Sequence, residues 1–107
     1  MLYKKDKGII RVNHGTGRVS LGPLRGVIEN IIIIPEDKEG ESEYVVYDLK
    51  ILDGDEDNVF FKKNIVGSLC HNSCVPIGKS YDENATVIIE NSSYNIDFQI
   101  VILTKER

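Results

Sequence analysis

Hydrophobic and polar residues alternate along several short runs of this chain. The clearest run places Val45, Tyr47, Leu49 and Ile51 at every second position from residue 45 to 51. A period of two residues is the pattern of a β-strand with one buried face. We therefore predict a half-buried strand over this run, with its odd-numbered side chains directed inward.

Two other runs are apolar on both faces. Ile31–Ile34 is an unbroken run of four isoleucines, and Val101 and Leu103 fill the second face near the end of the last predicted strand. A strand that is apolar on both faces is either central in a sheet or covered on its second face. The strands predicted besides residues 45–51 are Gly8–Val12, Arg18–Leu21, Leu24–Pro35, Val59–Lys63, Ala85–Glu90 and Tyr94–Thr104.

Turn residues separate these runs. Asp53–Asp57 is predicted to be a turn, and Asn91-Ser92-Ser93 is predicted to join the last two strands as a hairpin. Ile65–Pro76 is predicted to be irregular with one short strand. Among the tyrosines, we expect Tyr47 and Tyr94 to face the core. The tyrosines expected at the surface are Tyr3, Tyr44 and Tyr81.

The composition favours β structure throughout. The chain contains 15 isoleucines and 10 valines, but only one alanine and 7 leucines. Branched side chains suit pleated strands, whereas alanine and leucine are preferred by helices. We therefore predict an all-β fold: an antiparallel β-sandwich, jelly-roll-like or Ig-like, with about seven or eight short strands. The predicted core is Ile32, Ile34, Val45, Tyr47, Leu49, Ile51, Val87, Ile89, Ile96, Phe98 and Ile100.

A chain of 107 residues fits one domain. We expect a basic N-terminal arm over residues 1–7 and a single β-sandwich domain over residues 8–107. The longest apolar run has four residues, far below the roughly 20 needed to span a bilayer. The charged N-terminus is not followed by the apolar stretch of a secretory signal. We therefore expect neither a membrane partner nor secretion.

Charge is divided unevenly along the chain. Residues 1–25 carry six basic side chains and one acidic one, for a net charge of +5, while residues 26–107 carry −9. One interpretation is a solvated surface that keeps a small domain in solution. The other is a basic arm that contacts an acidic flank of a second copy, such as the region of Glu36–Glu43. The acidic total and the four arginines argue against a nucleic-acid partner.

Two clusters resemble metal sites without matching one. Cys70 and Cys74 flank His71, and His14 could add a fourth ligand, but zinc sites usually show a second cluster. A disulfide and a Cys–His nucleophile are further alternatives. We predict free, unmetallated thiols. In Asp53–Asp57 the carboxylates alternate as they do in calcium-binding loops, but the glycine and glutamate of an EF-hand loop are missing. We therefore favour an acidic β-turn over a weak calcium site. We expect no cofactor.

From Leu24 onward the chain resembles small proteins encoded among the virion structural genes of tailed bacteriophages. The resembling segments cover about three-quarters of the chain, and the Cys70–Cys74 insert departs from the pattern. These segments are an Ile-rich strand from Gly26-Val27-Ile28 through Ile34-Pro35, a Tyr-x-Val-x-Asp strand from Tyr44 that closes on Asp53-Gly54, Gly67-Ser68-Leu69 followed by Pro76-Ile77, and the Ala-Thr-Val-x-Ile strand that starts at Ala85.

The resemblance implies a non-enzymatic structural role in a virion. The expected protein is a decoration, cement or minor component that binds a major capsid protein or another virion protein, as a homo-oligomer. The alternatives are a carbohydrate-binding β-sandwich of a host-attachment apparatus, which the lack of tryptophan disfavours, and a small enzyme, for which no acid–base pair stands out. The candidate partner contacts are Leu2, Tyr3, Lys4, Lys5, Lys7, Ile9, Ile10, Arg11, Arg18 and Arg25.

Overall fold

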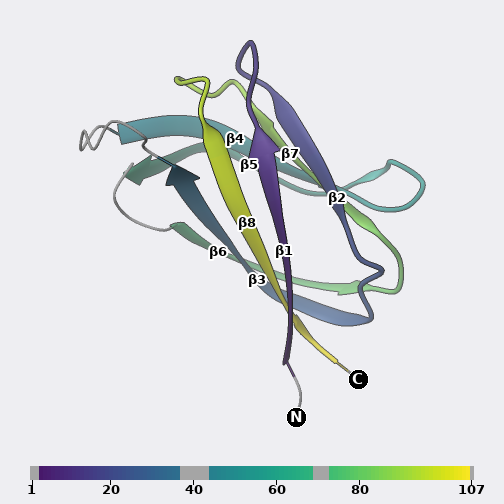
Figure 1. Ribbon diagram of the computed structural model, residues 1–107. Coiled ribbons are helices and arrows are strands. Elements are labelled where there is room, and N and C mark those ends of the chain that lie inside the picture. Colours follow the sequence, from purple (N-terminus) through teal and green to yellow (C-terminus); the bar gives the residue numbers. More distant parts are fainter. Residues whose placement is uncertain (1–2, 37–43, 69–72, 107) are drawn as a thin grey trace.

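The computed structural model describes residues 3–36, 44–68 and 73–106, which form eight strands and no helix (Figure 1). The strands are β1 (Tyr3–Arg11), β2 (Gly17–Leu21), β3 (Gly26–Glu36), β4 (Tyr44–Leu52), β5 (Asn58–Ser68), β6 (Ser73–Tyr81), β7 (Ala85–Glu90) and β8 (Asp97–Lys105). Two antiparallel sheets of four strands, ordered β1-β8-β3-β6 and β2-β7-β4-β5, pack on each other. The predicted all-β sandwich is confirmed.

The strand pairing is that of a jelly roll. The first strand pairs with the last, the second with the seventh, the third with the sixth and the fourth with the fifth, all antiparallel. The chain thus behaves as one long hairpin rolled into two sheets. An Ig-like sandwich would hold its first two strands in one sheet, whereas β1 and β2 lie in different sheets. Of the two predicted topologies, the jelly-roll-like one is observed.

The core lies between the inner faces of the two sheets. As predicted, the odd-numbered side chains of β4 point inward, and Val45, Tyr47, Leu49 and Ile51 are fully buried. The Tyr47 and Phe98 rings meet edge to face, with their centroids 5.1 Å apart. The predicted core positions Val87, Ile89, Phe98 and Ile100 are also buried, and Ile96 is partly buried against the core.

The prediction for β3 has the wrong phase. Ile31 and Ile33 are fully buried, while Ile32 and Ile34 are only half-buried on the outer face of the sheet. A β-bulge between Ile28 and Asn30 shifts the register against both neighbouring strands. Because all four residues are isoleucine, the sequence does not show which alternate pair faces the core. The bulge determines that the pair is Ile31 and Ile33. The prediction of a central strand is confirmed, because β3 lies between β8 and β6.

The predicted hairpin at Asn91-Ser92-Ser93 is wrong. β7 and β8 belong to different sheets, and the segment between them crosses from one sheet to the other. The Ser93 N–H donates to the Val46 carbonyl of β4 (2.9 Å), and the Ile96 carbonyl accepts from the Val12 N–H (3.1 Å). Both strands have a buried face, and placing them in opposite sheets lets those faces meet across the core. Tyr94, predicted to face inward, is 39% exposed on this crossing segment.

Two strand boundaries also differ from the predictions. Within Ile65–Pro76, β5 continues to Ser68 and β6 begins at Ser73, so the described part of this segment is regular strand. The expected boundary between an arm and the domain at residue 7 is not seen. Tyr3–Lys7 continue β1 and pair with β8 up to Lys105. No helix in the described residues has the length and hydrophobicity needed to cross a bilayer.

Candidate functional site

Strand β1 divides the predicted contact residues between its two faces. Tyr3, Lys5, Lys7, Ile9 and Arg11 are exposed on the outer face of the β1-β8-β3-β6 sheet. Because side chains alternate along a strand, the even-numbered residues point to the inner side.

The inner side of β1 accounts for one failed prediction. Ile10 is fully buried in the core and cannot contact a partner, so its prediction as a contact is wrong. Lys4 is on the inner side but near the strand end, where its side chain remains 48% exposed, with its Nζ 4.0 Å from the Asp6 carboxylate. Leu2 lies outside the described residues.

The outer face of this sheet is largely apolar across all four strands. Val101 of β8 lies opposite Ile32 of β3, which in turn lies opposite Cys74 of the edge strand β6. Ile9 and Tyr3 of β1 are among the most exposed large hydrophobic residues of the described chain, at 50% and 57%. The rows across the sheet are Tyr3–Lys105–Val27–Ser80, Lys5–Leu103–Asn30–Pro76, Lys7–Val101–Ile32–Cys74 and Ile9–Gln99–Ile34.

The charged side chains in these four rows are all lysines. Lys5, Lys7 and Lys105 lie on β1 and β8, so positive charge flanks one side of the apolar surface. Acidic residues lie at two places beside these rows: half-buried Glu29 is the extra residue of the β3 bulge next to Asn30, and one row beyond Ile9 Asp97 lies opposite Arg11 and Glu36. The face is thus apolar in its middle and basic along β1. We call these four rows the outer sheet face.

A shallow hollow of about 480 Å³ lies on the outer sheet face between β1 and β8. Its lining includes Lys7, Gly8, Ile9 and Val101. The backbone of Gly8, whose Cβ direction points to the inner side toward Val19 and Leu21, forms part of the floor between Lys7 and Ile9. The hollow can accept an apolar side chain from a partner, next to a cationic group.

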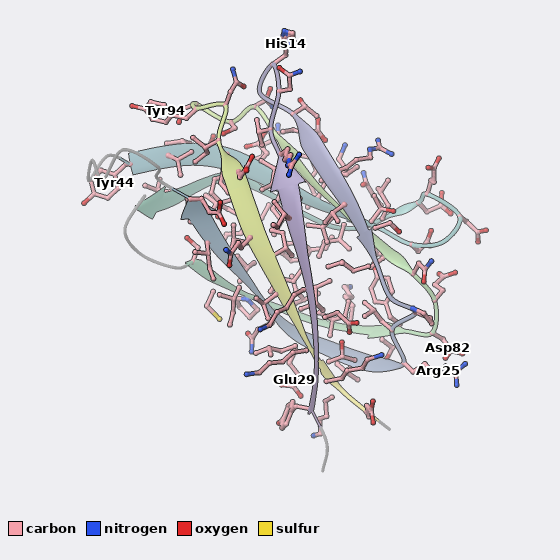
Figure 2. The ribbon with its side chains drawn as sticks, viewed as in Figure 1. His14, Arg25, Glu29, Tyr44, Asp82 and Tyr94 are labelled. Atoms are coloured by element: carbon pink, nitrogen blue, oxygen red, sulfur yellow. The ribbon has the colours of Figure 1, made fainter. Side chains whose placement is uncertain are left out.

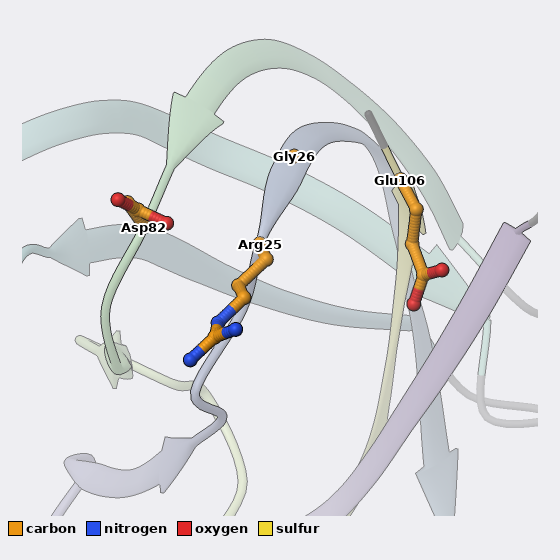
Figure 3. A pocket seen from close by; sticks show the side chains of 4 residues that line it. All are labelled: Arg25, Gly26, Asp82 and Glu106. Atoms are coloured by element: carbon orange, nitrogen blue, oxygen red, sulfur yellow. The ribbon is translucent and has the colours of Figure 1, made fainter.

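The remaining predicted arginines lie away from the outer sheet face. Arg18 lines a hollow of about 400 Å³ on the other sheet, with Lys50 and Glu90, whose side chains form an ion pair of 2.9 Å. Arg25 lies at the end of the sandwich where β3 begins, in a hollow of about 430 Å³. Figure 3 shows its side chain between Asp82 and Glu106. The structure therefore does not bring the ten predicted contacts together into one surface.

The two clusters that resemble metal sites were not predicted to bind metal, and the structure describes only part of them. Cys70 and His71 lie outside the described residues, Cys74 is an exposed free thiol, and His14 is exposed at the tip of the loop between β1 and β2 (Figure 2). No three His, Cys, Asp or Glu side chains in the described ranges are grouped so as to hold a metal ion.

The predicted acidic turn at Asp53–Asp57 is confirmed as a turn. One carboxylate oxygen of Asp53 accepts from the backbone N–H groups of Asp55 and Asp57, each at 2.9 Å. The Asp53 carboxylate is thus used to hold the loop, as in the side-chain-closed turns typical of aspartate.

The outer face of the second sheet carries a different surface. Tyr44 is 70% exposed, and Val46 and Val66 lie opposite each other beside it. Tyr94 follows Ser93, which is hydrogen-bonded to Val46 in both directions, and Figure 2 shows both tyrosines at the same end of the molecule. The surface prediction is confirmed for Tyr3 and Tyr44 and wrong for Tyr81, which is 5% exposed.

An aspartate organises the polar part of this second surface. The Asp48 carboxylate accepts from the Asn64 backbone N–H and from the Asn91 side-chain amide, each at 2.9 Å. These hydrogen bonds, first of all the one from Asn64, hold the pKa of Asp48 below its usual value. Asn64 and Asn91 both adopt positive φ, so Asp48 stabilises a bulge and a turn rather than serving as a reactive group.

Residue patterns could have located the outer sheet face, but only in part. Val101 and Leu103 were visible as apolar residues on the second face of a strand, and Ile31–Ile34 as a run apolar on both faces, although the wrong pair of isoleucines was predicted to face the core. Their place beside Lys5 and Lys7 depends on β8 lying between β1 and β3, which no local pattern reveals. Comparison with known proteins finds no family model, no curated protein and no solved structure that matches this chain.

Proposed function

We propose that this protein is a non-enzymatic structural component of a bacteriophage particle. It attaches to a capsid or tail surface by protein–protein contacts through the outer sheet face. The observation that carries the proposal is the apolar surface crossing β1, β8, β3 and β6. Contiguous exposed apolar surface with a polar rim is the usual mark of a protein interaction site.

The fold is compatible with this role. Jelly rolls include viral capsid domains and also lectins, so the fold admits both the virion role and the carbohydrate-binding alternative. Function has to be argued from the surface and not from the fold. For the virion role the surface offers aliphatic contact area and lysines.

Attachment to a particle can be strong even when each single contact is weak, because a particle presents many equivalent binding sites. Exposed ion pairs contribute only about 0–1 kcal/mol each, so the three lysines alone would hold one copy weakly. A particle presents many equivalent sites, and a homo-oligomer that engages several of them gains avidity without new contacts. We therefore propose that the protein acts as a homo-oligomer in the assembled particle.

The first experiment asks whether the protein is present in particles. Purified particles of the phage that encodes it are analysed by mass spectrometry, and the protein is expected as a stoichiometric component. Its absence from intact particles would refute the virion role.

The second experiment locates the attachment surface. Removing residues 1–7 would take away more than half of the β1 pairing with β8, so surface substitutions are used in place of a truncation. We expect Val101→Glu combined with Ile32→Glu to reduce co-purification with particles at least about tenfold, because it places charges in the apolar centre. The matched control is Tyr44→Ala on the other sheet, and circular dichroism confirms that each variant is folded.

The control also separates the two candidate functions. The observation that favours carbohydrate binding is the exposed Tyr44 near Tyr94, since sugar rings stack on aromatic side chains. If Tyr44→Ala reduces attachment to cells or glycans while the outer-face variant has no effect, the carbohydrate-binding function replaces the structural one.

A further inference from the structure

The open edge of the β1-β8-β3-β6 sheet supports a more specific inference. It rests on the proposed function in one respect: the partner is taken to be a protein. β1 pairs with β8 on one side, and in the described residues no strand pairs with its other side. An edge strand with unpaired backbone groups can receive a further strand. Lysines and short strands usually guard such edges, and β1 is long and carries lysines at specific positions.

The backbone groups that face the open edge belong to the odd-numbered residues of β1. The Val12 N–H donates to Ile96 on the β8 side (3.1 Å), while Asn13 exchanges hydrogen bonds with Thr16 on the β2 side (2.9 and 3.2 Å). The Arg11 carbonyl also faces the β2 side, since a Cβ added to Gly17 would lie 2.6 Å from it. Backbone groups alternate sides along a strand, and the β1–β8 register has no bulge.

By this alternation Lys5, Lys7 and Ile9 direct their backbone N–H and C=O groups to the open edge. The same three residues direct their side chains to the outer sheet face. β2 stays beside β1 only as far as Gly8, where a Cβ would touch Val19 and Leu21. Toward the N-terminus β1 and β2 diverge from their shared loop (Figure 1). The open part of the edge is therefore Tyr3–Lys7.

A strand added to this edge would meet a defined row of side chains. Tyr3, Lys5, Lys7 and Ile9 follow one another along β1, so the row reads aromatic, basic, basic, aliphatic. Opposite charges directly across a strand pair are favourable, and like charges are unfavourable. The matching row on the partner is apolar, acidic, acidic, apolar at every second residue. That row reads the same in both chain directions, so it fits a parallel or an antiparallel strand.

The β1 strand of a second copy is a poor occupant of the edge. Two β1 strands paired with each other would bring Lys5 and Lys7 of both copies together, which like-charge repulsion disfavours. Asp6 does not relieve this repulsion because it lies on the inner side of β1, with its side chain 17% exposed. Charge therefore favours a partner that supplies carboxylates.

We propose that β1 captures an extended acidic segment of a partner protein by β-strand addition, with two alternating carboxylates opposite Lys5 and Lys7. An apolar residue at the end of that row, beyond the backbone pairing, contacts the exposed side chain of Ile9. Backbone hydrogen bonds to the odd-numbered residues of Tyr3–Lys7 supply the pairing, and the lysines supply the selectivity.

The test uses the full chain and a synthetic peptide, acetyl-Thr-Val-Thr-Glu-Thr-Glu-Thr-Val-Thr-amide, whose valines and glutamates share one face. The control peptide has the same composition with one glutamate moved to an adjacent position, so that it lies on the opposite face. We expect the first peptide to bind at least about tenfold more tightly in fluorescence anisotropy. On binding, the Lys5 and Lys7 amides should gain protection from hydrogen exchange.

Protein variants separate charge from backbone pairing. Lys5→Glu with Lys7→Glu should weaken binding at least about tenfold, while Lys62→Glu with Lys63→Glu on β5 should not. Lys7→Thr and Lys7→Pro both remove the charge, but only the proline removes an edge-facing N–H, which an edge strand tolerates. We expect the proline variant to bind at least about fivefold more weakly than the threonine variant. Lys5→Pro against Lys5→Thr repeats the comparison if Lys7→Pro does not fold.

Three outcomes would overturn the proposal. These are equal binding of both peptides, equal binding of the proline and threonine variants, and protection of the Lys5 and Lys7 amides by self-association in the absence of peptide. None of them depends on particles, so strand addition can fail while the protein is still found in virions. Conversely, if β1 binds the peptide but the protein is absent from particles, the edge site is supported and the virion role is refuted.

Discussion

Phe98 and Tyr47 join the two sheets at the level of single residues. Both rings are fully buried, and they meet at an interplanar angle of 62°. Aromatic pairs in this edge-to-face geometry add to the stabilisation from burial alone. These two residues therefore link β8 of one sheet to β4 of the other.

Phe98→Ala should lower the free energy of unfolding by about 3–5 kcal/mol, because it leaves a cavity in a packed core. This is a large part of the roughly 5–15 kcal/mol typical of a domain. Urea denaturation followed by circular dichroism measures the change. Tyr44→Ala, at a 70% exposed position, should change it by less than about 0.5 kcal/mol. A loss below about 1 kcal/mol for Phe98→Ala would contradict this assignment of the core.

Tyr81 should make stability depend on alkaline pH. Burial, together with the charges of Asp53 and Glu83, raises the pKa of Tyr81 to about 12, against about 10 in an unfolded chain. Between these values the unfolded chain loses the phenolic proton while the folded protein retains it. Stability contributed by Tyr81 is therefore complete below pH 10 and falls as the pH rises toward 12.

The variant Tyr81→Phe isolates this effect. The Tyr81 hydroxyl is buried and has no hydrogen-bond partner in the described residues, so the variant should differ by less than about 1 kcal/mol at pH 8. From pH 10 to 12 it should lose less stability than the parent in parallel urea titrations. The other tyrosines and the lysines titrate in both proteins, so their contribution cancels. Identical slopes would rule out Tyr81 as the source.

At the scale of strands, close approach of β3 to β8 depends on a glycine. Gly26 has φ of 133°, a region that side chains rarely adopt, and a Cβ there would overlap the Lys105 carbonyl of β8. Gly26 thus sets where β3 joins the first sheet. The bulge two residues later then sets which isoleucines face the core.

Gly26→Ala should cost at least about 2 kcal/mol of stability, from backbone strain together with the overlap. Gly78→Ala is the matched control, since Gly78 also has positive φ (67°) but nothing lies within 4 Å of an added Cβ. It should cost only about 1 kcal/mol. Thermal and urea denaturation compare the two. Equal losses would mean that the contact with Lys105 does not constrain β3.

At the scale of the whole molecule, the two outer faces differ in chemistry. The β1-β8-β3-β6 face joins an apolar centre to lysines. The β2-β7-β4-β5 face combines exposed aromatic residues with ions of both signs, including the Lys50–Glu90 pair. The Lys50 and Lys63 ammonium groups lie 5.5 and 5.8 Å from the Phe61 ring centre, which partly covers this exposed ring. The difference fits a module that meets its partner with one face.

The amino-acid pattern by itself determined the fold class, the inward face of β4 and the acidic turn. Each of these depends on local rules, namely branched residues in strands, alternation across a pleat, and aspartate in turns. It also revealed that two strands are apolar on both faces, which is half of the information that defines the outer sheet face.

Only the tertiary structure decided the rest. A bulge in β3 decided which of the isoleucines at 31–34 face the core. The segment at residues 91–93, predicted to be a hairpin, crosses between the two sheets. Ile10 is buried in the core and is not available to a partner. Residues 3–7 form part of β1 because they pair with β8. In a jelly roll the pairs are far apart in the chain, the first strand with the last, so strand neighbours and open edges are set by long-range pairing that local periodicity does not encode.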